Sequence, residues 1–307
     1  MDKKSTFNFI VVTGPTATGK TQFAAHLAAR IKGEIISADS RQVYRGMDLA
    51  TGKDFNDYIV GDITIPYHLV DIVDPGYEYS VYEFQKDFLR VYDEIQMKGK
   101  IPVLCGGTGM YIESVLKGYN MVKVPANEAL RNEIESKTDQ ELIDLLNTYK
   151  IPHNITDTTD RKRLVRALEI AGYYQSHPEI KIPFPEINPI IFGVYFERRT
   201  IRERITERLR KRLEGGMISE VEELLKKGLS PEQLKFYGLE YKYLTQYVTG
   251  ELSYDEMFHL LNTAIHQFAK RQMTWFRKME REGRKIHWID GHLPAQEKVK
   301  LALELIK

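Results

Sequence analysis

The chain lacks the residues that several common kinds of site require. It has a single cysteine, Cys105, which excludes an internal disulfide and a cluster of thiolate metal ligands. No H-E-x-x-H, paired C-x-x-C or G-x-S-x-G pattern occurs, so zinc hydrolysis and serine-type acyl transfer have no support. No leader of signal-peptide type is seen and no apolar run approaches the length of a membrane span. We therefore expect a cytoplasmic protein without a membrane partner.

An excess of one charge is also missing, because the net charge is only +1. The basic residues are nevertheless concentrated in three stretches, at 161–166, 198–212 and 270–285. The second contains eight Lys or Arg against two Glu. One such stretch is typical of a solvated helix, but three favour a phosphate-rich polymer as partner. Trp275 and Phe276 lie within the third, where helical spacing favours a place in the core over stacking on bases.

One motif is specific. Residues Gly14–Thr21 read GPTATGKT, which fits G-x-x-x-x-G-K-[ST], and they follow the apolar run Phe9–Val12 and precede an amphipathic helix. In that context the loop amides, the helix N-terminus and Lys20 bind a polyphosphate, and Thr21 is placed to ligate Mg²⁺.

Strand and helix patterns alternate along the chain. We expect strands at Phe9–Thr13, Glu34–Ala38, Tyr67–Val70, Ile101–Cys105, Ile190–Phe196 and Lys285–Ile289. Such alternation predicts a parallel sheet with helices on both faces. An apolar stripe formed by Ile201, Ile205, Leu209 and Leu213 leaves the arginines of that helix facing water or a ligand. With the loop motif, the predicted class is α/β, a P-loop NTPase-like fold.

No strand pattern appears between residues 124 and 189, where we expect helices at 128–136, 140–149 and 160–175. A proline-rich linker follows them, with Pro178, Pro183, Pro185 and Pro189. The predicted organisation is a core over 1–120, a helical insert over 121–188 and the rest of the core over 189–307.

Two further segments are expected beside the loop. Asp39 ends the second strand, and ligands of such sheets bind at the carboxyl ends of the strands. It could help hold Mg²⁺, accept a proton from an attacking group, or only cap the next segment. Gly106-Gly107-Thr108-Gly109 ends the fourth strand at the same edge, where its amides and the Thr108 hydroxyl could contact the same ligand.

Six ordered blocks together resemble the tRNA dimethylallyltransferase family. They are Gly14–Thr21, Asp39–Tyr44, Pro66–Asp71, Gly106–Tyr111, Arg163–Glu169 and Ala269–Phe276. The resemblance implies transfer of a dimethylallyl group from dimethylallyl diphosphate to N6 of the adenosine 3′ of the anticodon, in the anticodon stem-loop of tRNA.

The resemblance also implies roles for individual residues. Asp39, Lys20 and Thr16 would be catalytic, with Asp39 the base that takes a proton from the adenine amine. The diphosphate would bind Gly14, Pro15, Thr16, Ala17, Thr18, Gly19, Lys20 and Thr21. The tRNA would contact Asp39, Ser40, Arg41, Gln42, Thr108, Lys162, Arg163 and Arg166, so the helical insert would be a tRNA-binding domain. We expect a monomer with Mg²⁺ as cofactor.

Four segments depart from the family's pattern. The loop usually close to Gly-Thr-Ala-Lys-Pro is Ala50-Thr51-Gly52-Lys53-Asp54 here, and a Gly-Tyr-Lys-Glu block is Glu240-Tyr241-Lys242-Tyr243. His266 replaces an arginine, and Tyr149–His153 lacks the usual Asp-Pro step. These departures would suit a paralogue with altered tRNA choice, a slower one, or one that only binds tRNA. A small-molecule or nucleotide kinase with the same loop is the alternative in another reaction class.

Overall fold

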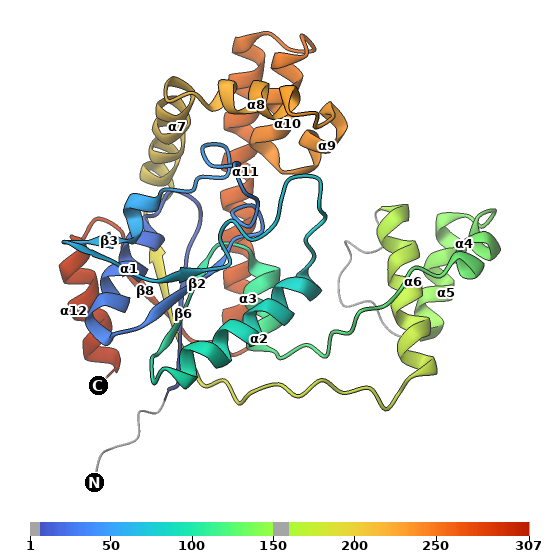
Figure 1. The fold of residues 1–307 in the computed structure, drawn as a ribbon, viewed down its shortest axis with the longest axis horizontal. Coiled ribbons are helices and arrows are strands. Elements are labelled where there is room, and N and C mark those ends of the chain that lie inside the picture. The colour runs from blue at the N-terminus through green and yellow to red at the C-terminus, as the bar shows by residue number, and fades with distance from the viewer. Residues whose placement is uncertain (1–6, 150–159, 307) are drawn as a thin grey trace. The chain divides into compact units, whose positions relative to one another are not determined.

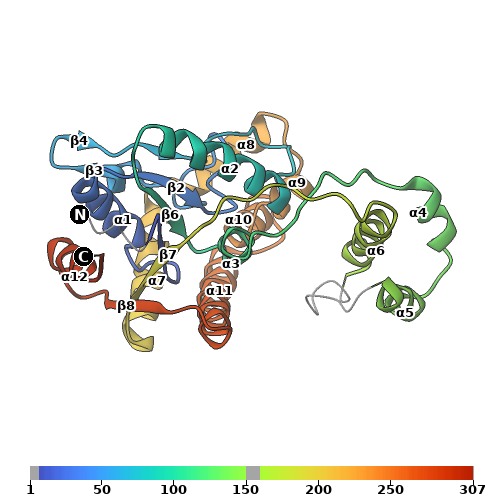
Figure 2. The same cartoon turned by 90° about the horizontal axis from the view of Figure 1, so that it is seen from below.

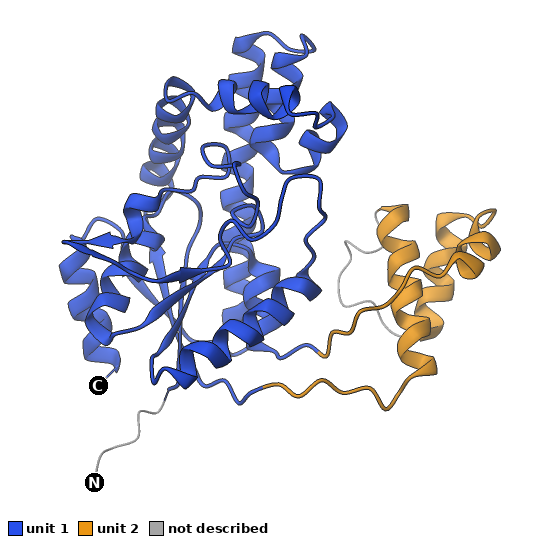
Figure 3. Ribbon diagram, in the orientation of Figure 1, with its two compact units in different colours: residues 1–119, 185–307 blue, residues 120–184 orange. Residues whose placement is uncertain are grey.

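The computed structural model describes residues 7–149 and 160–306. The chain divides into two compact units, shown in Figure 3. The first unit comprises Met1–Tyr119 and Pro185–Lys307, and the second is Asn120–Phe184. The second unit therefore lies in the region for which the sequence predicts a helical insert.

A six-stranded parallel sheet forms the centre of the first unit, in the order β5-β2-β6-β1-β7-β8. Its strands are β1 (Phe9–Thr13), β2 (Glu34–Ala38), β5 (Tyr67–His68), β6 (Pro102–Gly106), β7 (Pro189–Tyr195) and β8 (Ile286–Asp290). Every residue of β1, β2 and β6 is buried, as expected of parallel strands covered on both faces. The predicted α/β class is confirmed, with strand bounds within one residue except in β5.

Strand β5 ends two residues earlier than predicted. Leu69 and Asp71 have left-handed backbone angles, with φ of 61° and 55°, and this turns the chain out of the sheet. A two-stranded hairpin of β3 (Ile59–Val60) and β4 (Ile63–Thr64) precedes β5 and was not predicted. Strands of two residues are too short to show a period.

Helices cover both faces of the sheet (Figure 2). Helices α1 (Lys20–Ile31) and α12 (Ala295–Ile306) share a buried cluster with Ile10 and Val12 of β1. On the opposite face, Phe9 of β1 packs edge-on against Phe88 of α2 (Val81–Met97), and α2 also contacts α3 (Gly109–Leu116). This alternation along β1 places the loop after it between the two helical layers.

Five helices form a second core in the first unit (Figure 1). They are α7 (Arg198–Glu214), α8 (Met217–Lys226), α9 (Pro231–Phe236), α10 (Leu239–Val248) and α11 (Tyr254–Arg281). Ile205, Leu209 and Leu213 of the predicted stripe are buried in it, together with Val43 and Tyr44 from the segment after β2. The arginines of α7 are not among the buried residues of this core.

The second unit is a small bundle of α4 (Glu128–Ile134), α5 (Asp139–Tyr149) and α6 (Arg161–Ser176). The three helices begin and end within two residues of their predicted bounds. Five apolar residues make its core: Ile134, Leu142, Leu146, Leu164 and Leu168. Of the predicted departure at Tyr149–His153, residues 150–153 lie outside the described residues.

Within residues 7–149 and 160–306, no helix combines the length and the apolar composition that crossing a membrane would need.

Candidate active site

The loop between β1 and α1 has the backbone of an anion-binding turn. Gly14 and Gly19 have φ of 147° and 75°, and Ala17 is also left-handed at 63°. A Cβ atom on Gly14 would lie 2.5 Å from the carbonyl oxygen of Val194 in β7, so no larger residue fits there. The turn is thus held tightly against the sheet while it redirects the chain into α1.

The loop presents its donors to one position. In the described part of the chain, the amides of Ala17, Thr18 and Gly19 have no protein acceptor. The hydroxyl of Thr18 is directed back into the loop, where it donates to the carbonyl oxygen of Pro15 at 2.9 Å. Free amides at the N-terminus of α1 suit a phosphate group.

Lys20 adds a full charge at the same place. Its ammonium group lies within 3.4 Å of the Pro15 carbonyl oxygen. Burial lowers the pKa of Lys20, and the negative charge of Asp39 acts in the opposite direction. An ammonium group that loses hydration in this way is stabilised by an anion in the loop.

Thr21 and Cys105 lie next to this lysine. Burial raises the pKa of the Cys105 thiol to about 12, although Thr21 is its hydrogen-bond partner. Cys105 is thus a buried neutral side chain.

Asp39 is fixed at the carboxyl end of β2. Its Oδ1 atom accepts a hydrogen bond from the Arg41 amide at 2.9 Å. The next amide, of Ser40, donates to the Thr108 hydroxyl at 3.1 Å, and the Thr108 amide donates to the carbonyl oxygen of Ala38 at 3.2 Å. The turn after β2 and the Gly-Gly-Thr-Gly loop after β6 are therefore joined, with Asp39 between them.

Gln272 of α11 links the phosphate-binding loop Gly14–Thr21 to the Gly-Gly-Thr-Gly loop after β6. Its Oε1 atom accepts from the Thr16 amide at 2.8 Å, and its Nε2 atom donates to the Gly107 carbonyl oxygen at 2.9 Å. A Cβ atom on Gly107 would lie 2.3 Å from Nε2, so glycine is needed for this approach. Sequence reasoning missed Gln272 as a site residue, although it lies inside the block Ala269–Phe276.

We expect Gln272→Leu to lower the free energy of unfolding by about 3 kcal/mol, because it leaves the Thr16 amide and the Gly107 carbonyl without partners in a buried place. Urea denaturation measures this. Gln22→Leu, at an exposed position of α1, is the matched control and should change stability by about 0.5 kcal/mol or less. Equal effects of the two substitutions would contradict a linking role for Gln272.

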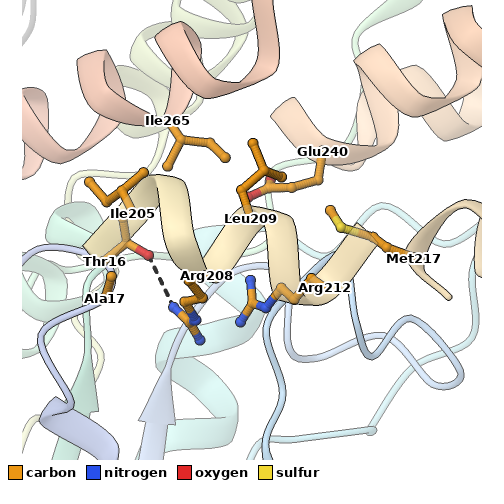
Figure 4. A pocket seen from close by; sticks show the side chains of 9 residues that line it. All are labelled: Thr16, Ala17, Ile205, Arg208, Leu209, Arg212, Met217, Glu240 and Ile265. Atoms are coloured by element: carbon orange, nitrogen blue, oxygen red, sulfur yellow. Dashed lines mark hydrogen bonds between the residues drawn. The ribbon is translucent and has the colours of Figure 1, made fainter. Parts of the chain in front are cut away.

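Two arginines of α7 hold the phosphate-binding loop from the other side. Arg204 donates through Nε to the Ala17 carbonyl oxygen at 2.9 Å. Arg208 lies 3.4 Å from the Thr16 hydroxyl and 3.4 Å from the carbonyl oxygen of Gly52 (Figure 4). Burial lowers the pKa of Arg208, and nearby carboxylates led by Asp57 oppose the shift. The sequence placed these arginines toward water or a ligand, but it gave no reason to choose Arg208.

A cavity of about 20 Å³ lies beside the loop. It is lined by Thr16, Ala17, Ile205, Arg208, Leu209, Arg212, Met217, Glu240 and Ile265, shown in Figure 4. This volume is close to that of one water molecule. Its wall joins the phosphate-binding loop to two arginines and one carboxylate.

Two more residues of the first unit that are predicted to contact tRNA, Arg41 and Gln42, differ in their contacts. Gln42 lies 3.4 Å from the Ser37 hydroxyl and donates to the Gly52 carbonyl oxygen at 3.4 Å. The Arg41 guanidinium lies over the exposed ring of Phe236, 5.8 Å from its centroid. Gln42 thus supports the loop that contains Gly52, whereas Arg41 is at the surface of the first unit.

The predicted tRNA residues of α6 differ in their surroundings. Lys162 and Arg163 are exposed, and the Arg163 amide is capped by Asp160 at 3.1 Å. Arg166 instead donates to the carbonyl oxygen of Val124 at 2.7 Å and pairs with the buried carboxylate of Glu169 at 2.7 Å. Arg166 therefore stabilises the second unit internally.

Two other expectations concern α11. His266 shares hydrogen bonds with the Thr206 hydroxyl (3.3 Å) and the Arg202 carbonyl oxygen (3.2 Å), and burial lowers its pKa. His266 thus makes local hydrogen bonds at the position where the family's pattern has an arginine. Phe276 is fully buried, as predicted, whereas Trp275 is partly exposed and packs against Gly109.

A parallel sheet, a glycine-containing loop between β1 and α1 and an acid at the carboxyl end of β2 define a P-loop fold, in which such a loop suits a phosphate group. Comparison with known proteins identifies the family. A family profile described as IPP transferase matches residues 42–279. The chain belongs to this family, which confirms the resemblance seen in the sequence.

Curated relatives cover nearly the whole chain. A protein of Bacteroides fragilis named tRNA dimethylallyltransferase 2 is 55% identical over 98% of both chains. One of Parabacteroides distasonis, named tRNA dimethylallyltransferase 1, is 53% identical over 98% of both.

Two solved structures are similar to this chain. A tRNA isopentenylpyrophosphate transferase from Bacillus halodurans has a TM-score of 0.69 at 31% identity, over 97% of this chain and 95% of that one. A eukaryotic dimethylallyltransferase acting on tRNA has a TM-score of 0.77 over 97% of this chain and 79% of that one, and at 23% identity it supports the fold alone.

Proposed function

We propose that this protein transfers the dimethylallyl group of dimethylallyl diphosphate to N6 of the adenosine that follows the anticodon of a tRNA, and releases diphosphate. Relatives with more than half of their residues identical are named for this activity. The observation that carries the proposal is the position of Asp39. Its carboxylate is fixed at the end of β2 and acts electrostatically on Lys20 of the phosphate-binding loop.

The diphosphate binds the loop Gly14–Thr21. As the bond between the allylic carbon and oxygen breaks, negative charge grows on the diphosphate. The loop amides and Lys20 stabilise that charge, and Arg208 approaches it from α7 next to Thr16. Thr16 is held on two sides, by Arg208 through its hydroxyl and by Gln272 through its amide.

Asp39 acts on the nucleophile. The adenine amine is a weak nucleophile because its lone pair is delocalised into the ring. Its nitrogen forms the new bond to the allylic carbon, and the proton that it loses passes to the Asp39 carboxylate. The Arg41 amide occupies Oδ1, so Oδ2 is the oxygen left to accept the proton.

The residues fit a magnesium ion bound chiefly through the diphosphate. The described ranges contain no cluster of three or more acidic, His or Cys side chains suited to a metal. Mg²⁺ commonly needs only one or two protein oxygens, with phosphate oxygens and waters completing its shell. Thr21 would supply its hydroxyl, and the ion would add positive charge beside the leaving diphosphate.

The target base must leave its stack to reach Asp39. RNA loops are recognised in this splayed form through basic and stacking contacts. Ser40, Arg41 and Gln42 follow Asp39 in the turn after β2, and the Thr108 hydroxyl accepts a hydrogen bond from the Ser40 amide. These four residues would contact the anticodon loop. Lys162 and Arg163 are exposed on α6 and would contact the phosphates of the stem.

We expect Arg163→Ala to weaken tRNA binding roughly threefold or more and to reduce the slope of log affinity against log salt by about one, since one phosphate contact is lost. Arg166→Ala should mainly destabilise the second unit, because it leaves the buried carboxylate of Glu169 less well paired. Titration of tRNA at several salt concentrations, with thermal unfolding alongside, separates the two effects. An unchanged salt slope for Arg163→Ala would remove this residue from the interface.

The activity itself can be tested directly. The protein is incubated with a tRNA pool and dimethylallyl diphosphate, and the nucleosides are analysed by mass spectrometry. A new N6-dimethylallyl adenosine supports the proposal. Unmodified tRNA, together with thermal stabilisation by Mg²⁺–ATP but not by dimethylallyl diphosphate, would instead indicate a kinase.

A further inference from the structure

Arg212 is a half-buried cation on the wall of the cavity. Among the residues that the structure describes, it makes no hydrogen bond and no ion pair, although it is half-buried. Burial, and after it the neighbouring charge of Arg208, lower its pKa to about 10. Two guanidinium groups one helical turn apart, both partly dehydrated, favour the binding of an anion between them.

The loop that contains Gly52 is shaped around this arginine. A Cβ atom on Gly52 would lie 2.3 Å from Nη2 and 3.0 Å from Cζ of Arg212. Alanine, which the family's loop pattern has at this position, would therefore collide with the guanidinium. Gly52 also has φ of +77°, so its backbone independently favours glycine.

Two more departures from the family's pattern supply negative charge near Arg212. Glu240 stands where the pattern has glycine, and Asp54 where it has proline. Both carboxylates act on Arg212 in the direction that favours its charged form, Glu240 more than Asp54. Burial raises the pKa of Glu240, and the charge of Arg212 opposes that rise. Glu240 also lines the same cavity (Figure 4). Two departing segments that are far apart in the sequence, Ala50–Asp54 and the one that begins at Glu240, thus act on one side chain.

We propose that Arg212 is a second diphosphate-binding arginine beside Arg208, and that Glu240 is the positioning residue that balances its charge when no ligand is bound. This inference rests on the proposed function, because it assigns a further contact to the same substrate. Arg212 is directed to the diphosphate rather than to the tRNA backbone because Thr16 and Ala17 of the phosphate-binding loop line the cavity with it.

Two substitutions with opposite expected effects on the Kd of inorganic pyrophosphate test the proposal. Arg212→Gln removes a positive charge and should raise the Kd of inorganic pyrophosphate about tenfold. Glu240→Gln removes a negative charge but nearly keeps the shape of the side chain. It should lower this Kd about threefold, because the positive charge of Arg212 is then no longer compensated. A purely structural role for both residues would weaken binding in both variants. Isothermal titration calorimetry with pyrophosphate, with and without Mg²⁺, measures the constants without any need for turnover.

Arg210→Gln is the matched control. Arg210 belongs to the same helix but lies over the ring of Phe258, 5.7 Å from its centroid, and is exposed. Its loss should leave the pyrophosphate Kd within twofold of the wild type.

Gly52→Ala completes the test as a double-mutant cycle. The substitution strains the backbone in any background, but it collides with a guanidinium only when Arg212 is present. We expect it to raise the pyrophosphate Kd several-fold in the wild type and to have little further effect in Arg212→Gln. Equal effects in both backgrounds would contradict the contact.

The outcomes separate the inference from the proposed function. If the wild type does not bind pyrophosphate, the proposed function fails. If it binds and Arg212→Gln binds equally well, Arg212 is not a diphosphate ligand. If Arg212→Gln loses tRNA affinity and salt dependence with the pyrophosphate Kd unchanged, the arginine contacts an RNA phosphate and the proposal is overturned.

Discussion

Asp39→Asn is expected to lower kcat by about 10³-fold, while the Kd for tRNA stays within twofold of the wild type. An amide cannot accept the proton that the adenine amine loses, so the step that depends on the base is lost. Asparagine keeps an oxygen for the hydrogen bond from the Arg41 amide, which preserves the turn after β2. Single-turnover prenylation, with tRNA binding measured separately, distinguishes the chemical step from association.

Asp57→Asn is the matched control for this result. Asp57 is another carboxylate whose charge acts on Lys20 and Arg208, and burial raises its pKa. It lies in the short 3₁₀ helix Phe55–Tyr58 and is not among the residues predicted to contact tRNA. If Asp39 acts as a base, Asp57→Asn should change kcat by less than about tenfold. Similar losses in both variants would show that Asp39 acts only through its charge on the cations of the loop.

The sheet and the phosphate-binding loop were predictable because their signals are local. Short apolar runs mark buried parallel strands, and the glycines of Gly14–Thr21 act within a single turn. The three helices of the second unit were predictable for a similar reason, since each has its own apolar period. Strand β5 was overestimated because the left-handed backbone of Leu69 has no signature in that residue type.

The contacts that hold the site together come from distant parts of the chain. Gln272 and Thr16 are 256 positions apart, and Arg208 and Thr16 are 192 apart. Nothing in a single sequence indicates which arginine of a basic helix will face the loop.

The same limitation applies to α6. The sequence pattern does not distinguish its arginines. In the structure, however, Arg166 pairs with Glu169 and with backbone carbonyls, whereas Arg163 remains exposed. Which charges are used inside a unit depends on packing that the sequence pattern does not contain.

Lys20→Met is expected to lower kcat/KM for dimethylallyl diphosphate by about 10²–10³-fold, because the loop loses its full positive charge next to the leaving group. The unliganded protein should become slightly more stable, with Tm higher by about 1–3 °C. In the wild type, burial of the ammonium group is compensated by a carbonyl oxygen at 3.4 Å and by the charges of Asp39 and Asp57. Replacing it with an apolar side chain of similar length removes this cost.

Pyrophosphate separates these opposing effects in one assay. It should raise the Tm of the wild type and leave that of Lys20→Met nearly unchanged, since the stabilisation depends on ligand affinity for the folded state. Lys20→Arg is the control for charge, and it should retain part of the shift while its fork geometry misplaces the contact. A full pyrophosphate shift in Lys20→Met would mean that the anion binds elsewhere, and the loop after β1 would then be no more than a structural turn.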